Sequence, residues 1–242
     1  QPKMNLSANT VGGAEALLRW NRGNPQSIQP DEFIPIIEST ELIHDIGAWV
    51  IQEACRKCKQ WHEGGYPIRV AANVSALQLT RPNFYSVVLE ALQSCSLDPK
   101  YLEIELTEHL LIQENKEVKT QLAALKSLGV SLSIDDFGTG YSNMNYLTKL
   151  KVDSLKLDKS FISQITQSEE YLVIVTAIIR MAKVLGMEVV AEGIETNAEK
   201  QVLIDLDCDY AQGYLWSKAI SSKDFLRLLG DFPSSKCQVV AL

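Results

Sequence analysis

The sequence predicts a single α/β domain, built as an eight-stranded barrel of the (β/α)8 kind, and three observations support this prediction. From residue 68 onward, short β-like runs alternate with stretches of helical periodicity, which is typical of a parallel sheet covered by helices. The 242 residues suit one such barrel, because barrels of this kind commonly occupy about 250 residues. No stretch has the composition of a linker, a low-complexity tract or a short internal repeat.

The expected elements follow one another regularly. An extended segment at 13–20 precedes a loop rich in Pro, Gly and Asn, and helical stretches lie between residues 31 and 61, the first of them capped by Asp31. Further strands are expected at 68–75, 101–107, 131–136, 153–158, 188–192 and 209–215. Helices are expected at 84–94, 118–128, 172–185, 198–206 and 223–229. These strands make seven, and the eighth is expected around residues 3–6.

The charge balance argues against two classes of partner. The chain has 23 Lys and Arg against 30 Asp and Glu, a net charge of −7, and this surplus opposes association with polymeric nucleic acid or an anionic membrane. The longest apolar stretch, 171–179, is stopped by Arg180, far short of the roughly 20 residues that a membrane helix needs. We therefore expect no nucleic-acid polymer and no membrane contact for this domain.

The cysteines and the first residues bear on cellular context. Five cysteines, odd in number and sparse for the length, do not indicate a disulfide framework. A reducing, cytoplasmic compartment is the simpler expectation. The sequence begins without Met and without the order of a signal peptide. We therefore expect residues 1–242 to be one domain of a longer protein, which other segments can anchor to a membrane.

Side chains within the expected strands divide into two sets, because successive residues of a strand point to opposite faces. One set is apolar and should lie under the helices: Val70, Ala72, Val74, Leu102, Ile104, Leu106, Leu132, Ile134, Leu155, Leu157, Val189 and Ala191. The other set points into the barrel and ends in functional groups: Glu15, Asn73, Glu105, Asp135, Lys156, Asp158, Glu192 and Gln212. Functional groups of barrel enzymes gather at the carboxyl ends of the strands, where these residues fall.

The inward carboxylates predict a metal site, because several ionised acids buried together are costly unless cations or protons compensate them. Asp, Glu and Asn oxygens are hard ligands that suit Mg²⁺, Mn²⁺ or Ca²⁺. Asp135 and Asp136 stand where a strand becomes a loop, so that both can reach one site and one can bridge two ions. Two ions about 4 Å apart can clamp the attacking and leaving oxygens of a phosphoryl displacement. The pattern therefore favours phosphodiester hydrolysis.

Seven motifs stand in order along the chain. They are Glu15-Ala16-Leu17 with Arg19, Asn73-Val74-Ser75, Glu105-Leu106-Thr107-Glu108, Asp135-Asp136-Phe137-Gly138-Thr139-Gly140, Lys156-Leu157-Asp158, Glu192-Gly193-Ile194-Glu195 and Gln212-Gly213-Tyr214. Together they resemble the EAL-domain cyclic-di-GMP phosphodiesterases of bacteria, from the first residues to about Phe232. The resemblance implies a modified (β/α)8 barrel whose first strand is antiparallel to the others. It also implies opening of cyclic di-GMP to linear pGpG with Mg²⁺ or Mn²⁺, two ions being expected and Ca²⁺ being inhibitory.

The resemblance further implies partners and residue roles. A homodimer and neighbouring GGDEF or sensory domains are frequent in this family. The expected metal ligands are Glu15, Asn73, Glu105, Asp135, Asp136 and Glu192, and the expected catalytic groups are Glu192, Lys156 and Asp135. The expected substrate contacts are Arg19, Gln212, Asp158 and Glu195, and Glu108 is expected to hold the loop at 137–142. Arg19 would supply the local phosphate clamp that an acidic protein needs.

Some positions depart from the common pattern of the family. Trp216 and Ala219 stand where Phe and Pro are usual, and Asn143 begins a stretch that replaces a more Ser- and Leu-like one. These changes concern the last loop and the substrate-side loop. They touch none of the expected metal ligands.

Other interpretations of the same residues stay open at this point. The inward acids can be strand-end ion pairs, Lys156 a charge-balancing core lysine, and Glu108 and Glu195 solvated acids. Cys55 and Cys58 form a lone CxxC, for which helix packing is favoured over zinc. The whole chain can also be a catalytically silent cyclic-di-GMP receptor, or a barrel enzyme that uses Lys156 as a Schiff-base nucleophile or a proton-abstracting base.

Overall fold

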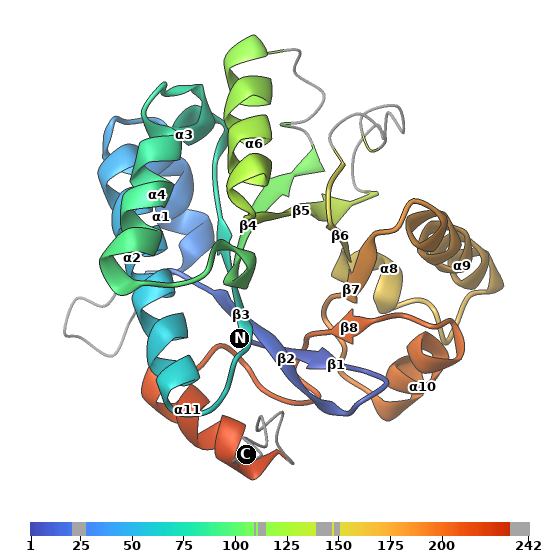
Figure 1. The fold of residues 1–242 in the computed structure, drawn as a ribbon. Helices are drawn as coiled ribbons and strands as arrows, with labels where there is room; N and C mark the ends of the chain where they lie inside the picture. The colour runs from blue at the N-terminus through green and yellow to red at the C-terminus, as the bar shows by residue number, and fades with distance from the viewer. Residues whose placement is uncertain (21–27, 109, 111–114, 139–146, 148–150, 233–242) are drawn as a thin grey trace.

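Eight strands pair in chain order and close into a barrel in the computed structural model, which describes residues 1–20, 28–108, 110, 115–138, 147 and 151–232 (Figure 1). The strands are β1 (Pro2–Asn5), β2 (Thr10–Ala16), β3 (Arg69–Asn73), β4 (Leu102–Thr107), β5 (Ser131–Phe137), β6 (Ser154–Leu157), β7 (Glu188–Ala191) and β8 (Tyr210–Ala211). The predicted α/β barrel is confirmed, and the segments expected to form strands overlap these eight.

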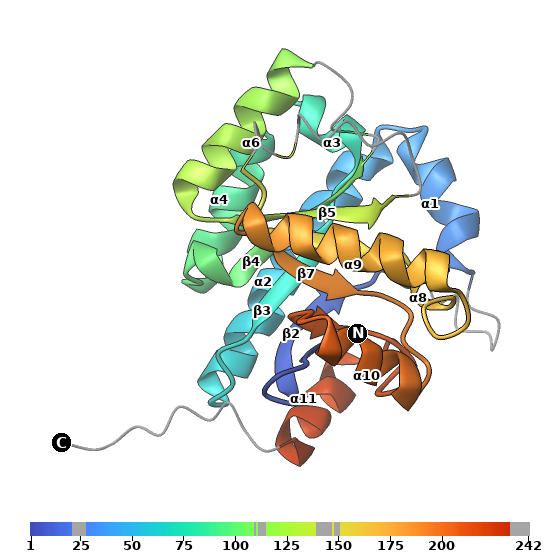
Figure 2. The same cartoon turned by 90° about the vertical axis from the view of Figure 1, so that its right-hand side faces the viewer.

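Helices cover the outside of the barrel. They are α1 (Pro30–Glu38), α2 (Leu42–Glu63), α3 (Ala76–Thr80), α4 (Phe84–Cys95), α6 (Lys116–Leu128), α8 (Lys159–Ile162), α9 (Glu169–Val184), α10 (Asn197–Asp205) and α11 (Ser222–Asp231), with a 3₁₀ turn at Pro99–Tyr101. In Figure 1, α2, α4 and α6 lie on one side of the barrel and α9 and α10 on the other. In the view turned by 90°, α9 runs across the front of the strands (Figure 2). None of the described helices has the length and hydropathy to cross a membrane.

The first strand runs against the others. β1 pairs antiparallel with β2 on one side and with β8 on the other, whereas each pair from β2 to β8 is parallel. Only four residues, 6–9, join β1 to β2, which permits a hairpin but not the long crossover that parallel neighbours need. The barrel is therefore closed by an N-terminal hairpin, as the resemblance implied.

The apolar set of strand residues forms the core between the sheet and the helices. Val70, Leu102, Ile104, Leu132 and Val189 are each at most 1% exposed and belong to one continuous cluster of buried side chains. Burial of such side chains contributes roughly 1.5–3 kcal/mol each. The division of the strands into two faces is thus confirmed for this outward-pointing set.

Three local details differ from the sequence-based expectations. The N-cap of α1 is Gln29, and Asp31 lies inside the first turn, because Pro30 occupies the first helical position, where its missing N–H is no loss. The last strand is much shorter than 209–215, since only two residues pair. The short helices α3 and α8 follow β3 and β6 directly and were not expected.

Candidate metal centre

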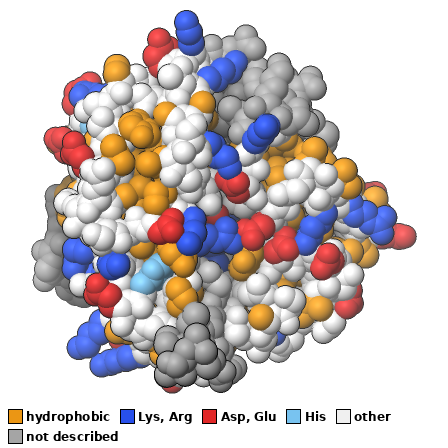
Figure 3. Space-filling view, viewed as in Figure 1, with side chains coloured by type: hydrophobic (Ala, Val, Ile, Leu, Met, Phe, Trp, Pro, Cys, Tyr) orange, Lys and Arg blue, Asp and Glu red, His pale blue; other side chains and the backbone are white. Residues whose placement is uncertain are grey.

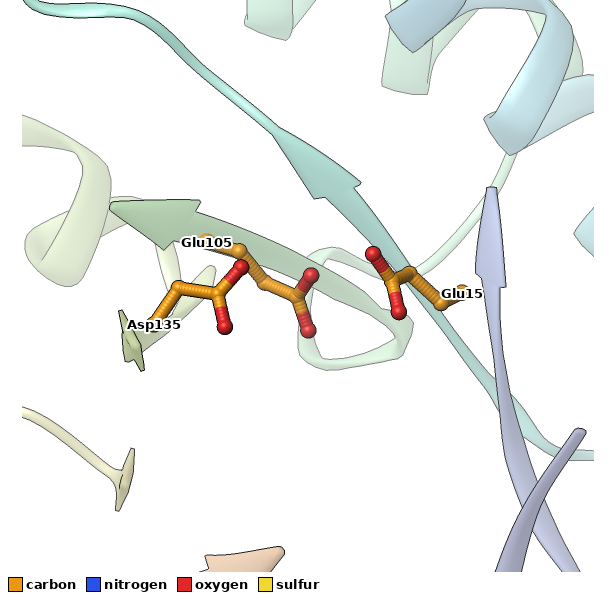
Figure 4. Close-up of side chains that lie close together, drawn as sticks. All are labelled: Glu15, Glu105 and Asp135. Carbon is orange, nitrogen blue, oxygen red and sulfur yellow. The ribbon is translucent and has the colours of Figure 1, made fainter. Parts of the chain in front are cut away.

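Carboxylates from three strands point toward one another at the carboxyl end of the barrel. Glu15 comes from β2, Glu105 from β4 and Asp135 from β5, and Figure 4 shows their side chains converging. One oxygen of each lies within 4.8 Å of the others. A second group with the same spacing consists of Asp135, Asp136 and Glu192. Asp135 belongs to both groups, which is the arrangement expected of a ligand shared by two sites.

An irregularity of β5 brings both Asp135 and Asp136 to the site. In a regular strand they would point to opposite faces, but between Ile134 and Phe137 the strand carries one residue more than its partner β6. This is a β-bulge, which redirects a side chain and is common beside active sites. Asp136 has φ 52°, a left-handed conformation that Asp tolerates better than most residues. The bulge explains how consecutive acids share one site.

Lys156 of β6 lies at the centre of these acids. Its Nζ is 2.9 Å from Glu192, 3.0 Å from Asp135, 3.1 Å from Glu105 and 3.5 Å from Glu15, and the residue is 1% exposed. A single ammonium group therefore lies within ion-pair distance of four carboxylates. Burial opposes the charged form, but the surrounding acids, Glu105 first, hold the pKa of Lys156 well above its usual value.

A second buried cation, Lys3 of β1, was missed by the sequence analysis. Its Nζ is 2.6 Å from an oxygen of Glu103 and 2.6 Å from an oxygen of Glu105. Lys3 pairs with Gly13 in the β1–β2 register. Gly13 is two residues before Glu15 and therefore on the same inward face of β2, so antiparallel pairing of residues 2–5 with 10–14 was the signal that would have revealed Lys3. Among the described residues, the barrel interior thus contains the ammonium of Lys3 in addition to that of Lys156.

The acids of the cluster do not share one protonation behaviour. Burial would raise the pKa of Glu15, but Lys156, Lys3 and hydrogen bonds from Gln212 and Asn73 lower it to about 2. Burial, assisted by Glu15 and Asp135 and opposed by the two lysines, raises the pKa of Glu105 to about 8. Burial likewise raises the pKa of Glu192 to about 7, against the effect of Lys156. Without a cation, the cluster therefore retains protons near neutral pH.

A pH dependence follows for the metal-free protein. The folded-state pKa values of Glu105 and Glu192 lie above the ordinary value of 4.5, so their contribution to stability is complete below about pH 4.5 and is lost as pH rises through 7 to 8. A divalent cation that binds the ionised acids offsets this loss. We expect Mn²⁺ to raise the melting temperature more at pH 8 than at pH 6, measured by thermal unfolding with and without the ion. Equal increments at the two pH values would contradict the prediction.

Two amide side chains orient the carboxylates. Asn73 donates from Nδ2 to Glu15 at 2.7 Å, and Gln212 donates from Nε2 to Glu15 at 2.7 Å and to Glu192 at 3.0 Å. The Oε1 atom of Gln212 is buried and has no hydrogen-bond partner in the described structure. Oxygen donors of this kind, carboxylates with amide oxygens beside them, suit hard cations such as Mg²⁺ and Mn²⁺. The residues present therefore fit a divalent metal centre.

The expected substrate contacts lie in different surroundings. Arg19 is exposed and lines a cleft of about 710 Å³, together with Ile34, Asn73 and Glu105, a size within the usual range of about 300–1,000 Å³ for small-molecule sites. Asp158 caps α8 by accepting from the Ser160 N–H at 3.0 Å. Glu195 is exposed and pairs with Lys159 at 2.5 Å. The cleft connects Arg19 with the acid cluster. Asp158 and Glu195, in contrast, have partners within the fold.

Glu108 contacts the loop that it was expected to hold. Its Oε2 accepts from the Gly138 N–H at 3.0 Å, and its buried Oε1 has no partner in the part of the chain that the structure describes. The rest of that loop beyond residue 138, and the Asn143 position, lie outside the described residues. Cys55 and Cys58 are buried and free, and neither belongs to a potential metal group of the described residues.

On the face shown in Figure 3, Lys and Arg side chains are interspersed with Asp and Glu. The described residues on this face form no broad area of one charge sign, and apolar side chains lie between the charged ones. The described residues of this face therefore show no charge concentration comparable with the acid cluster inside the barrel.

Comparison with known proteins adds a family to this geometry. The cyclic di-GMP phosphodiesterase NbdA of Pseudomonas aeruginosa is 40% identical over 231 residues, which cover 94% of this chain and 30% of NbdA. The bifunctional diguanylate cyclase/cyclic di-GMP phosphodiesterase MucR of the same species is 38% identical over 227 residues, covering 93% of this chain and 33% of MucR. A solved complex of the PaMucR phosphodiesterase with c-di-GMP has a TM-score of 0.88 at 38% identity, over 93% of this chain and 92% of that one.

The chain spans about a third of the length of these curated relatives. Within that part, the sequence model of the EAL domain matches residues 1–219. The match takes in every strand of the barrel and every residue of the acid cluster. The chain belongs to the EAL domain family.

Proposed function

We propose that the chain is a metal-dependent phosphodiesterase that hydrolyses cyclic di-GMP to linear pGpG. Relatives that are 38–40% identical are named as phosphodiesterases of this dinucleotide. The observation that carries the proposal is the complete acid cluster, in which Asp135 is common to two groups of potential metal ligands. A protein that only binds the dinucleotide has no need of such a cluster, so an active enzyme is favoured over a silent receptor.

Two divalent cations, Mg²⁺ or Mn²⁺, are proposed for the two carboxylate groups. Glu15, Glu105 and Asp135 would hold one ion and Asp135, Asp136 and Glu192 the other, with Asn73 beside Glu15. When bound, such ions offset negative charge on phosphoryl oxygens and favour deprotonation of the attacking water. The residues have the donor types that these ions prefer.

The protein's own groups have separable tasks in this proposal. Glu192, at the edge of the second carboxylate group, would accept the proton of the attacking water at a carboxylate oxygen. Lys156 keeps the surrounding acids in place, and Gln212 orients Glu15 and Glu192 through its Nε2. Arg19, at the rim of the cleft, binds a phosphate of the substrate.

Carbonyl chemistry at Lys156 is not favoured by the structure. A Schiff-base lysine must be available as the neutral amine, whereas four carboxylates around Lys156 stabilise its charged form and raise its pKa well above the usual value. Lys156 is therefore suited to holding acids in place rather than to nucleophilic attack.

The direct test is hydrolysis by the purified domain. With Mg²⁺ or Mn²⁺ we expect conversion of cyclic di-GMP to pGpG. Chromatography of the reaction mixture measures this conversion. EDTA should abolish turnover and added metal should restore it. Glu15→Gln should lower turnover, because it removes a ligand charge that Lys156 and Gln212 hold in place. Tight binding of cyclic di-GMP without turnover at any metal concentration would identify a receptor instead.

The setting of the domain is part of the same proposal. We propose that residues 1–242 act as one domain of a longer cytoplasmic protein, as a homodimer and beside a GGDEF or sensory domain. The longer protein and the neighbouring cyclase-type domain are supported by the share of the relatives that the chain matches and by MucR, whose name combines a cyclase with a phosphodiesterase. Light scattering of the domain and of the full-length protein would test the dimer.

A further inference from the structure

Lys3 has a position that the proposed reaction does not yet explain. It enters the barrel interior from β1, the antiparallel strand between β2 and β8. Its ammonium lies between two glutamates that follow each other on the inward face of β4, Glu103 and Glu105. All three residues are at least nine-tenths buried. A lysine placed in this way restricts the carboxylate that it contacts.

Glu103 fixes Lys3 from the far side. One oxygen of Glu103 accepts from Lys3 at 2.6 Å, and the other accepts from Ser154 Oγ at 3.2 Å. Lys3 and Glu103 also line a small cavity of about 20 Å³ together with Arg69, and Glu105 does not line it. Glu103 therefore lies nearer the amino end of β4 than Glu105, and its ion pair holds the ammonium of Lys3 on that side of the acid cluster.

The two oxygens of Glu105 are consequently assigned to different neighbours. Oε1 contacts Lys3 at 2.6 Å, and Oε2 contacts Lys156 at 3.1 Å on the side where Glu15, Asp135 and Glu192 converge. A cation in the cluster can share Oε2 with Lys156. It can use Oε1 as well only by displacing the buried ammonium of Lys3, which would leave Glu103 with the more distant Arg69, 4.0 Å away, as its cationic neighbour.

Mg²⁺ and Ca²⁺ differ in how they coordinate a carboxylate. Mg²⁺ takes six ligands in octahedral geometry and usually one oxygen from each carboxylate, whereas Ca²⁺ takes six to eight and accepts bidentate carboxylates. We propose that Lys3 is a positioning residue that keeps Glu105 monodentate and thereby favours Mg²⁺ over Ca²⁺ at this centre. This inference rests on the proposed metal-dependent function and assigns the choice of metal to a residue of the antiparallel strand.

Calorimetric titration of metal-free protein with Mg²⁺ and with Ca²⁺ tests this role without an activity assay. The main variant is Lys3→Met with Glu103→Gln, since removing both charges leaves no unpaired ion and the fold can be checked by circular dichroism. The matched control is Glu103→Gln alone, which keeps the contact between Lys3 and Glu105. Because loss of a group that orients a ligand weakens binding by about 10–100-fold, we expect the affinity ratio of Ca²⁺ to Mg²⁺ to rise about tenfold or more in the double variant and to stay near the wild-type value in the control.

The outcomes separate the two levels of the proposal. If wild type binds Mg²⁺ but the ratio in the folded double variant stays within about twofold of wild type, well below the usual effect of losing such a group, the role of Lys3 is overturned and the proposed function stands. If wild type binds neither ion, the metal-dependent function itself is overturned. A structure of the Ca²⁺-loaded double variant should show both oxygens of Glu105 on the ion.

Discussion

Asp135→Asn is expected to lower cyclic di-GMP hydrolysis by about 10²–10³-fold or more, since loss of a single group that stabilises the transition state already has an effect of this size. Asp135 is the residue common to both carboxylate groups, so its charge is lost from both at once. Asn keeps the size of the side chain and its oxygen, but not the charge that a divalent cation requires. The rate of pGpG formation at saturating Mn²⁺ measures the effect.

A matched variant separates this loss from a general effect of charge. Asp205→Asn makes the same substitution on the exposed side of α10, where Asp205 accepts a hydrogen bond from Gln201 of the same helix. We expect its turnover to equal that of wild type. Calorimetry should show weaker Mn²⁺ binding for Asp135→Asn than for wild type, and unchanged binding for Asp205→Asn. Wild-type turnover in Asp135→Asn would rule out the assignment of this residue as a shared ligand.

Lys156→Met is expected to destabilise the metal-free protein by about 3–5 kcal/mol at pH 8, the usual effect of removing one partner of a buried ion pair. Four carboxylates lose the ammonium that lies 2.9–3.5 Å from them. A cation bound to the same carboxylates supplies positive charge in its place. The difference from wild type should therefore become smaller when Mn²⁺ is present, which urea unfolding with and without the ion would measure.

Lys126→Met provides the comparison for Lys156. Lys126 pairs with Asp153 at 2.5 Å, but its side chain is 29% exposed, and ion pairs near the surface contribute only about 0–1 kcal/mol. The loss of stability in Lys126→Met should be small, and Mn²⁺ should not change it. Wild-type stability of metal-free Lys156→Met would contradict this prediction. It would mean that bound protons alone neutralise the negative charge of the acids.

The regular part of the site could be predicted from local pattern, because alternation along a strand decides which side chains enter a barrel. This placed Glu15, Glu105 and Asp135 together, and the structure confirms that they converge. The contacts of Lys3 with Glu103 and Glu105 cross the barrel interior between β1 and β4, which are not paired and lie about 100 residues apart in the chain, and no local pattern contains them. The partners of Asp158 and Glu195 escaped prediction for a related reason: α8, which provides Ser160 and Lys159, is too short to show a helical period.

The hairpin that closes the barrel also has a consequence for the order of folding. β1 pairs with β8, so residues Met4 and Ala211 must meet across almost the whole sequence, and such distant contacts form slowly because of the entropy lost on closing a long loop. Gln212, which follows β8, reaches Glu15 and Glu192 at this closure. We therefore expect the amide that orients these two acids to be placed late in folding, when the eighth strand docks.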